Sequence, residues 1–190
     1  MSGVVRDRGG LLTGGLVLSL VPVLYLHVVS ADELNPVTDV ISDYVFVRNG
    51  TKWLAVASLS LAAVSGLLGW RLRHVPGPAR WLIAGWTVGL AVATVFPTDP
   101  TGEPTTLSGH VHRYAAGVMF VCLPAAGLLI ARQFPALRTV AVTAGVSSVA
   151  FLVSHVSFEG FTVRGLAERL LFVALYVLLF AIAGLHRRTT

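Results

Sequence analysis

Long apolar runs separated by short polar segments dominate the chain. Six of these runs hold roughly 20 residues, the length that an α-helix needs to cross the hydrocarbon core of a bilayer. They lie near residues 11–29, 53–70, 79–96, 111–131, 136–156 and 166–185. The strands of a membrane barrel would instead alternate in polarity over about ten residues, and the chain shows no such pattern. The predicted fold class is all-α, with residues 1–190 forming a single domain of six transmembrane helices.

The segment between the first two runs reads NPVTDVISDYVF and covers residues 35–46. Asn35 is a common N-cap residue and Pro36 suits the first position of a helix, so a helix is predicted to begin here. The segment is too short to span a membrane and should lie at the interface, over the outer mouth of the bundle. Asp39 and Asp43 are four residues apart, which predicts that both lie on one face of this helix.

Composition and charge add a location and an orientation. With 55% hydrophobic and only 12% charged residues, the chain is not a soluble domain but a multi-pass protein of the cell membrane. Nine of the 14 Lys and Arg residues fall at the side of the termini, which predicts that both termini are cytoplasmic. These nine are Arg6, Arg8, Arg71, Arg73, Arg80, Arg132, Arg138, Arg187 and Arg188.

Two alternative interpretations of these features are weaker. The first run, followed by Val29-Ser30-Ala31, could be a cleaved signal peptide, but its length favours a membrane span. The net charge of +5 reflects the asymmetry between the two sides of the membrane, so no nucleic-acid partner is predicted. The oligomeric state cannot be inferred from the sequence.

Ionisable residues gather at the outer ends of the spans. Asp99 follows the Phe96-Pro97 end of the third span, where the proline stops the helix and presents the carboxylate at the membrane boundary. His110 and His112 open the fourth span. Residues two apart on a helix point about 200° from each other, and we predict that His112 faces the bundle.

The last two spans bring further ionisable residues to the same level. His155 ends the fifth span, and Glu168 and Arg169 lie in the first turns of the sixth. Ionisable groups at that depth usually face the interior and find partners. Arg169 is therefore predicted to pair with Asp43 or Asp99, or else to bind an anionic headgroup.

These placements predict a polar site that opens to the outside. The residues predicted to be catalytic are Asp43, Asp99 and His112. The residues predicted to bind substrate are Asp39, Ser42, Tyr44, His155, Glu168 and Arg169. A divalent metal held by Asp43, Asp99, His112 and His155 is an open alternative, but no pair of ligands has the spacing of a zinc motif. No metal ligand is therefore assigned, and the cofactor stays unknown.

Several short motifs together resemble one known family. They are Asn35-Pro36, Ile41-Ser42-Asp43-Tyr44, Phe96-Pro97-Thr98-Asp99, Gly109-x-x-His112 and Glu168-Arg169-Leu170. Their combination is similar to the domain-of-unknown-function 998 family, whose members are small polytopic membrane proteins of bacteria and archaea. The resemblance covers nearly the whole chain. It implies the six-span fold and emphasises Asp43, Asp99, His112 and the Glu168-Arg169 pair, and it implies no activity.

Three functions remain open. The first is a membrane enzyme that uses acid–base chemistry on a lipid or isoprenoid-like substrate, by hydrolysis, transfer or cyclisation. The second is a non-catalytic partner subunit in which the polar residues lock the helices together. The third is a proton-coupled carrier of small molecules, against which the middle of the bundle holds almost no charge. The enzyme is the preferred hypothesis, with a membrane lipid or a hydrophobic small molecule as its partner.

Overall fold

The computed structural model of the chain describes residues 8–73, 75–156 and 160–188. Six α-helices make up most of it: α2 (Arg8–Val29), α3 (Gly50–Arg71), α4 (Gly77–Val95), α5 (Leu107–Ala131), α6 (Arg138–Val156) and α7 (Arg164–Arg188). Three short 3₁₀-helices are η1 (Ile41–Phe46), η2 (Pro135–Leu137) and η3 (Gly160–Val163). Each α-helix contains a segment long and apolar enough to cross a membrane. The predicted all-α fold with six spans and a short helix after the first span is confirmed.

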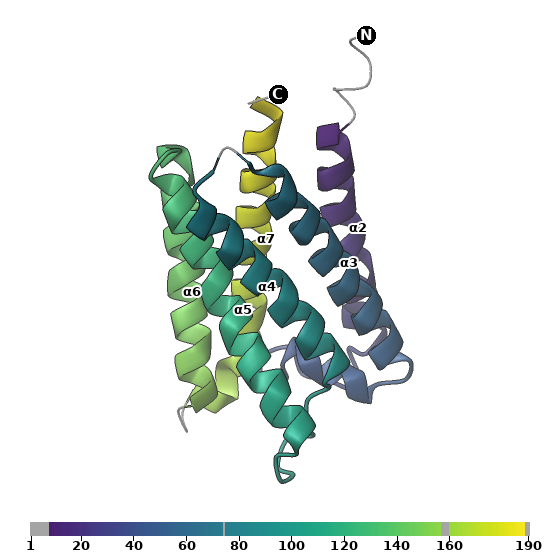
Figure 1. Cartoon of the computed structure of the whole chain (residues 1–190). Helices are drawn as coiled ribbons and strands as arrows, with labels where there is room; N and C mark the ends of the chain where they lie inside the picture. The colour runs from purple at the N-terminus through teal and green to yellow at the C-terminus, as the bar shows by residue number, and fades with distance from the viewer. Residues whose placement is uncertain (1–7, 74, 157–159, 189–190) are drawn as a thin grey trace.

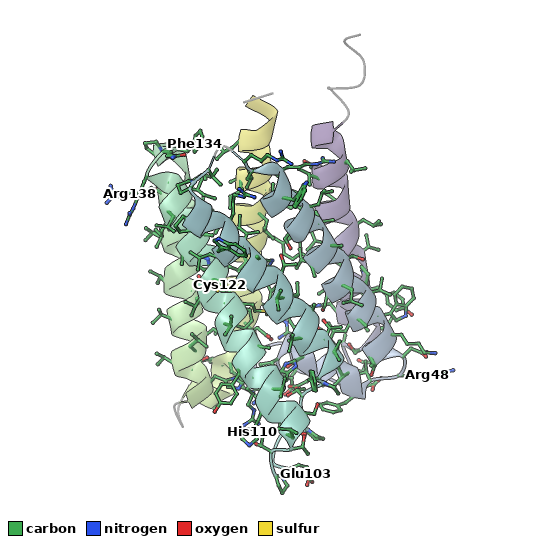
Figure 2. All side chains as sticks on the ribbon, in the orientation of Figure 1. Arg48, Glu103, His110, Cys122, Phe134 and Arg138 are labelled. Atoms are coloured by element: carbon green, nitrogen blue, oxygen red, sulfur yellow. The ribbon has the colours of Figure 1, made fainter. Side chains whose placement is uncertain are left out.

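The six α-helices run alternately up and down, so the two ends of the bundle differ (Figure 1). The beginning of α2 and the end of α7 lie at one end, which we call the termini end. The opposite end, which we call the η1 end, carries η1, the loop of residues 96–106 and η3. In Figure 2, Phe134 and Arg138 mark the termini end, and Arg48, Glu103 and His110 mark the η1 end. Arg6, one of the residues behind the predicted orientation, lies outside the described residues.

The interior of the bundle is apolar, and most of its few polar side chains are hydrogen-bonded. Trp86 of α4 is fully buried, and its Nε1–H donates to Ser65 Oγ of α3 at 3.0 Å. Ser148 of α6 donates to the Phe120 carbonyl of α5 at 2.8 Å. A buried polar group that lacks a partner destabilises a fold, so these bonds let polar side chains hold neighbouring helices together.

Exposed aromatic side chains lie at both ends of the bundle. At the η1 end, the rings of Tyr25 and Trp53 pack 5.1 Å apart on the outside of α2 and α3. At the termini end, Trp70 and Trp81 are largely exposed. Trp and Tyr are enriched where the hydrocarbon core meets the lipid headgroups, so these four rings indicate the two membrane boundaries.

The segment after Pro36 departs from the predicted helix. Asn35 Oδ1 accepts the Val37 N–H at 2.9 Å and Asp39 Oδ2 accepts the Asn35 N–H at 2.8 Å, which closes a turn. Val40 is then extended, and η1 begins only at Ile41. The prediction that Asp39 and Asp43 share one helix face is therefore wrong, because side-chain bonds to the backbone compete with helical bonds here.

This segment, residues 35–46, lies against the first turn of α7. The Leu166 N–H donates to the Val37 carbonyl at 3.0 Å, and Arg164 Nε donates to the Thr38 carbonyl at 3.0 Å. Gly165 permits the close approach, since a Cβ at this position would lie 2.3 Å from the Asp39 carbonyl oxygen. The α7 helix thus positions η1 over the η1 end of the bundle.

Candidate functional site

A polar cavity of about 200 Å³ opens at the η1 end, between η1, the loop of residues 98–103 and helices α5, α6 and α7. The ionisable residues that line it are Asp43, Asp99, Glu103, His112, Arg113, His155, Arg164 and Glu168. The structure therefore brings the three residues predicted to be catalytic to one cavity. Of the residues predicted to bind substrate, Ser42, His155 and Glu168 also line it.

Asp43 is a buried carboxylate on η1, with 7% of its surface exposed. Its Oδ2 accepts the Val40 N–H at 3.0 Å and lies 3.7 Å from Nη2 of Arg164. Burial raises the pKa of the Asp43 carboxyl above its ordinary value of 3.8, although the Val40 N–H and Arg164 act in the opposite direction. Asp43 therefore holds a proton more readily than an exposed aspartate.

Arg164, and not Arg169, forms the ion pair with Asp43 that the sequence analysis predicted. It is the first residue of α7, is almost fully buried, and binds both Asp43 and the hydroxyl of Thr101, the latter at 2.7 Å. The predicted ion pair of Arg169 with Asp43 or Asp99 is wrong, because Arg169 points to the other side of α7. The sequence feature that could have identified Arg164 is its spacing of four residues from Glu168. Residues four apart on a helix share a face, so both side chains point into the bundle.

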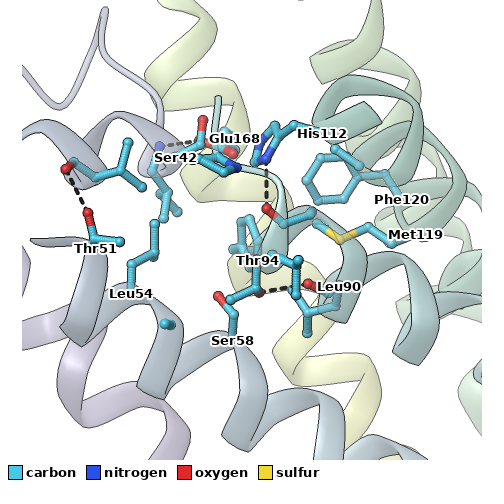
Figure 3. Close-up of a pocket in the computed structure, with 18 residues that line it drawn as sticks. Ser42, Thr51, Leu54, Ser58, Leu90, Thr94, His112, Met119, Phe120 and Glu168 are labelled. Atoms are coloured by element: carbon cyan, nitrogen blue, oxygen red, sulfur yellow. Dashed lines mark hydrogen bonds between the residues drawn. The ribbon is translucent and has the colours of Figure 1, made fainter. Parts of the chain in front are cut away.

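His112 faces the interior from the second turn of α5, as predicted, whereas His110 is exposed. Its Nδ1 lies 2.9 Å from the Ala93 carbonyl and 2.9 Å from the Phe96 carbonyl. Figure 3 shows His112 beside the apolar cavity, with one of these hydrogen bonds dashed. Because carbonyl oxygens only accept hydrogen bonds, Nδ1 carries the proton. In the neutral ring Nε2 is then unprotonated, and among the described residues it has no hydrogen-bond partner. His112 thus presents a basic nitrogen.

A second cavity, mainly apolar and about 300 Å³ in volume, adjoins the polar one. Its walls come from η1, α3, α4, α5 and α7, and include Leu54, Leu90, Met119 and Phe172. Ser42, His112, Ala116, Phe120 and Glu168 line both cavities. Figure 3 shows Ser42, Glu168 and His112 together at one side of the apolar cavity.

Glu168 is a buried carboxylate at this junction, with 5% of its surface exposed. Its Oε2 accepts the N–H of Ile41, the first residue of η1. A buried carboxyl needs polar partners, and the Ile41 N–H, which has no acceptor within η1, provides one. Glu168 therefore joins α7 to η1 and also contributes a carboxylate to both cavities.

Asp99 lies at the mouth of the polar cavity, where it holds the start of α5. Its oxygens accept the Thr106 N–H at 2.8 Å and the Thr106 hydroxyl at 2.7 Å, and Thr106 in turn caps α5 through the Gly109 N–H. These bonds lower the pKa of Asp99 below 3.8. A Cβ at Gly109 would overlap Asp99 Oδ2, so this arrangement requires glycine there. Asp99 is thus ionised and already hydrogen-bonded.

His155 lines the polar cavity from the end of α6, with its ring packed against Phe151 at 5.5 Å. Its Nδ1 is buried and has no hydrogen-bond partner among the residues that the structure describes. Buried polar atoms are rarely unsatisfied in proteins. His155 therefore lines the polar cavity with a ring whose Nδ1 is buried and unsatisfied among the described residues.

Three residues predicted to bind substrate lie away from both cavities. Asp39 is half-exposed and accepts hydrogen bonds from Asn35 and Thr38 within its own turn. Tyr44 and Arg169 form a separate cluster with His27 on the α2 side of α7. No sequence periodicity distinguishes the two sides of α7 at Glu168 and Arg169, because adjacent residues on a helix point only about 100° apart.

The acidic and imidazole side chains do not form a metal site in the part of the chain that the structure describes. No three His, Cys, Asp or Glu residues there are placed to hold one ion. Asp99 and His112 are instead directed to Thr106 and to main-chain carbonyls. The donor set of the polar cavity therefore suits proton transfer better than it suits metal coordination.

Comparison with known proteins identifies the family. Residues 13–185 match the family model described as protein of unknown function DUF998, so the chain belongs to this family. The resemblance seen in the sequence motifs is thereby confirmed. Neither a curated protein nor a solved structure matches the chain.

Proposed function

We propose that this member of the DUF998 family is a membrane enzyme that performs acid–base chemistry on a lipid or isoprenoid-like substrate. The observation that supports this function is the junction of the polar and apolar cavities at Ser42, His112 and Glu168. A molecule with a polar headgroup and an apolar chain would fill both cavities and place the bond between its two parts beside His112. Sites of this kind, concave and mostly apolar with a few convergent polar groups, are typical of small-molecule binding.

In this proposal Asp43 and His112 carry the proton transfers. Asp43, whose pKa is raised by burial, donates a proton to the substrate. His112 accepts one at Nε2, since its Nδ1–H is engaged by the Ala93 and Phe96 carbonyls. Hydrolysis, group transfer and cyclisation each need one proton donated and one removed, so the same pair serves all three.

The surrounding polar residues bind and position. Glu168 and Ser42 contact the substrate where head and chain meet, and His155 lines the part of the polar cavity that receives the headgroup. Arg164, whose Nη2 lies 3.7 Å from Asp43 Oδ2, positions this carboxyl and stabilises the carboxylate that remains after the proton is donated. Asp99 maintains the mouth of the cavity through Thr106 and takes no proton, because its lowered pKa keeps it ionised.

The proposal predicts a change in membrane lipids that depends on the chain. We expect cells that contain the protein to convert one lipid or isoprenoid species that accumulates in cells lacking it. Quantitative mass spectrometry of total lipid extracts from the two strains measures this directly. The Asp39→Asn variant is the matched control, because Asp39 lines neither cavity, and it should convert the same species as the wild type.

Two outcomes would contradict this function. Identical lipid and isoprenoid profiles with and without the protein, at confirmed expression, would exclude a lipid-converting enzyme. A profile that changes equally with the wild type and with a variant in which both Asp43 and His112 are replaced would favour a non-catalytic subunit.

The orientation proposed for this enzyme has the η1 end outside the cell and both termini in the cytoplasm. The excess of Lys and Arg on the termini side supports it. The site would then receive substrate from the outer leaflet. Because the chain has a single cysteine, Cys122, a Cys122→Ala background allows the two ends to be labelled separately.

We expect a cysteine at Glu103 to react with a membrane-impermeant maleimide in intact cells. A cysteine at Gln133 should react only after the cells are permeabilised. Both positions are exposed and lie at opposite ends of the bundle, so each is the control for the other. Labelling of Gln133→Cys but not of Glu103→Cys in intact cells would show that the orientation is the opposite of the one proposed.

A further inference from the structure

A third hollow, which we call the α2–α7 groove, lies between α2, α3 and α7 and has a volume of about 360 Å³. Its walls are almost wholly apolar, and Leu24 and Val173 at its rim are more than half exposed. Along α7 the groove extends from Arg169 to Phe180. Eleven residues of helix rise about 16 Å, close to half of the roughly 30 Å hydrocarbon core. The groove therefore has the depth of one lipid leaflet and opens toward the lipid.

Arg169 closes the groove at the η1 end. Its Nε donates to His27 Nε2 at 2.9 Å, and its Nη1 donates to the carbonyls of Asp39 and Gly165 at 2.6 and 3.0 Å. Its Nη2 donates to the Tyr44 hydroxyl at 3.1 Å. A guanidinium has five N–H donors, so one N–H of Nη2 is unused. All of these acceptors are uncharged, and Arg169 forms no ion pair with any described residue.

None of the hydrogen-bond partners of Arg169 carries a charge. His27 accepts from Arg169 at Nε2 and lies 3.1 Å from the Val23 carbonyl at Nδ1, so Nδ1 carries the proton and the ring is neutral. Tyr44 also accepts from Arg169, but it is 2% exposed and does not line the groove, so it anchors the guanidinium. The head of the groove thus combines the positive charge of Arg169 with its one unused N–H, at the level where lipid phosphates lie.

We propose that the α2–α7 groove binds a phospholipid with an anionic headgroup. Its phosphate accepts from Arg169 Nη2, and one acyl chain lies along the groove as far as Phe180. The charge of Arg169 favours an anionic lipid, and the leaflet-deep apolar walls favour a lipid over a soluble anion. The groove adjoins the apolar cavity, with which it shares Ile41, Leu54, Ser58, Leu90 and Phe172. Its polar end goes beyond the proposed enzyme, because Arg169 lines neither the polar nor the apolar cavity.

Native mass spectrometry of the full chain, released from detergent with equal amounts of phosphatidylglycerol and phosphatidylcholine of the same acyl chains, tests this site. We expect phosphatidylglycerol to be retained about ten-fold more, because its net negative charge is not offset by a choline ammonium as it is in phosphatidylcholine. Excess inorganic phosphate should not displace it. Arg169→Gln should abolish the preference. Equal retention of the two lipids by the wild type, displacement by phosphate, or a preference that survives Arg169→Gln would each overturn the proposal.

A second pair of variants tests the groove without changing its polar end. Val173→Trp places a large side chain at the rim of the groove, whereas Val146→Trp places one on the exposed side of α6. We expect Val173→Trp to lose bound phosphatidylglycerol and Val146→Trp to retain it. Equal retention by the two tryptophan variants would refute binding in the groove, and this comparison decides the question if Arg169→Gln does not fold.

Discussion

Replacement of His112 by asparagine is expected to abolish lipid conversion while leaving the bundle folded. The amide nitrogen of asparagine is as many bonds from Cα as Nδ1, so it can still donate to the Ala93 and Phe96 carbonyls. It has no counterpart of Nε2, the nitrogen that the proposal uses as the base. Loss of a general base typically slows a reaction by about 10²- to 10⁴-fold. The lipid profile measures the loss, and the thermal midpoint in detergent measures the fold.

The comparison variant is His112→Gln, whose amide reaches the position of Nε2 but cannot reach the two carbonyls in the same way. If His112 acts only by bonding those carbonyls, the asparagine variant should keep full conversion and the glutamine variant should lose it. If His112 is the base, both variants should be inactive. An active asparagine variant would therefore show that His112 has a structural role and is not the base.

Replacement of Gly165 by alanine is expected to displace the segment of residues 35–46 from α7. The new Cβ would lie 2.3 Å from the Asp39 carbonyl oxygen, and backbone cannot yield as a flexible side chain does. Overpacking of this kind costs about 1–3 kcal/mol of unfolding free energy. Because Asp43 and the Ile41 N–H that binds Glu168 lie in the same segment, conversion should fall as well. Thermal unfolding and the lipid profile measure the two effects.

Gly184→Ala on the same helix is the control. Nothing lies within 4 Å of a Cβ at Gly184, and alanine in a helix interior is favoured over glycine by about 0.5–1 kcal/mol. This variant should be as stable as the wild type or slightly more stable. Equal unfolding midpoints for the two alanine variants would mean that the contact between Gly165 and Asp39 does not hold the segment in place.

The helices were predictable because the composition of a whole segment, and not any single residue, predicts each of them. Each span contains about 20 apolar residues, and no single contact decides whether such a run is helical in a membrane. The inward position of His112 was also predictable, since on a regular helix His110 and His112 must point apart. The common cavity of Asp43, Asp99 and His112 was predictable because the sequence places all three at the same side of the membrane, near the ends of different helices.

The parts that the sequence did not predict depend on competition between local bonds. The side chains of Asn35 and Asp39 accept backbone N–H groups within residues 35–39. These bonds form a turn in place of a helix that begins at Pro36. Arg164 instead of Arg169 pairs with Asp43, because the two arginines are five residues apart and point about 140° from each other around α7. The separation of a polar from an apolar cavity depends on how side chains of five elements pack, which no pattern within a single helix encodes.

The exposed tryptophans of α3 have a consequence for the surrounding bilayer. Trp53 and Trp70 lie 17 residues apart, which corresponds to about 26 Å of helix, and tilt can only shorten the projected span. The α3 helix is long enough to cross an average hydrocarbon core of about 30 Å, but aromatic rings held about 26 Å apart favour a thinner one. We therefore expect local thinning of the bilayer around α3. The lipids that border the η1 end would then lie deeper than their neighbours, which brings their headgroups toward the mouth of the polar cavity.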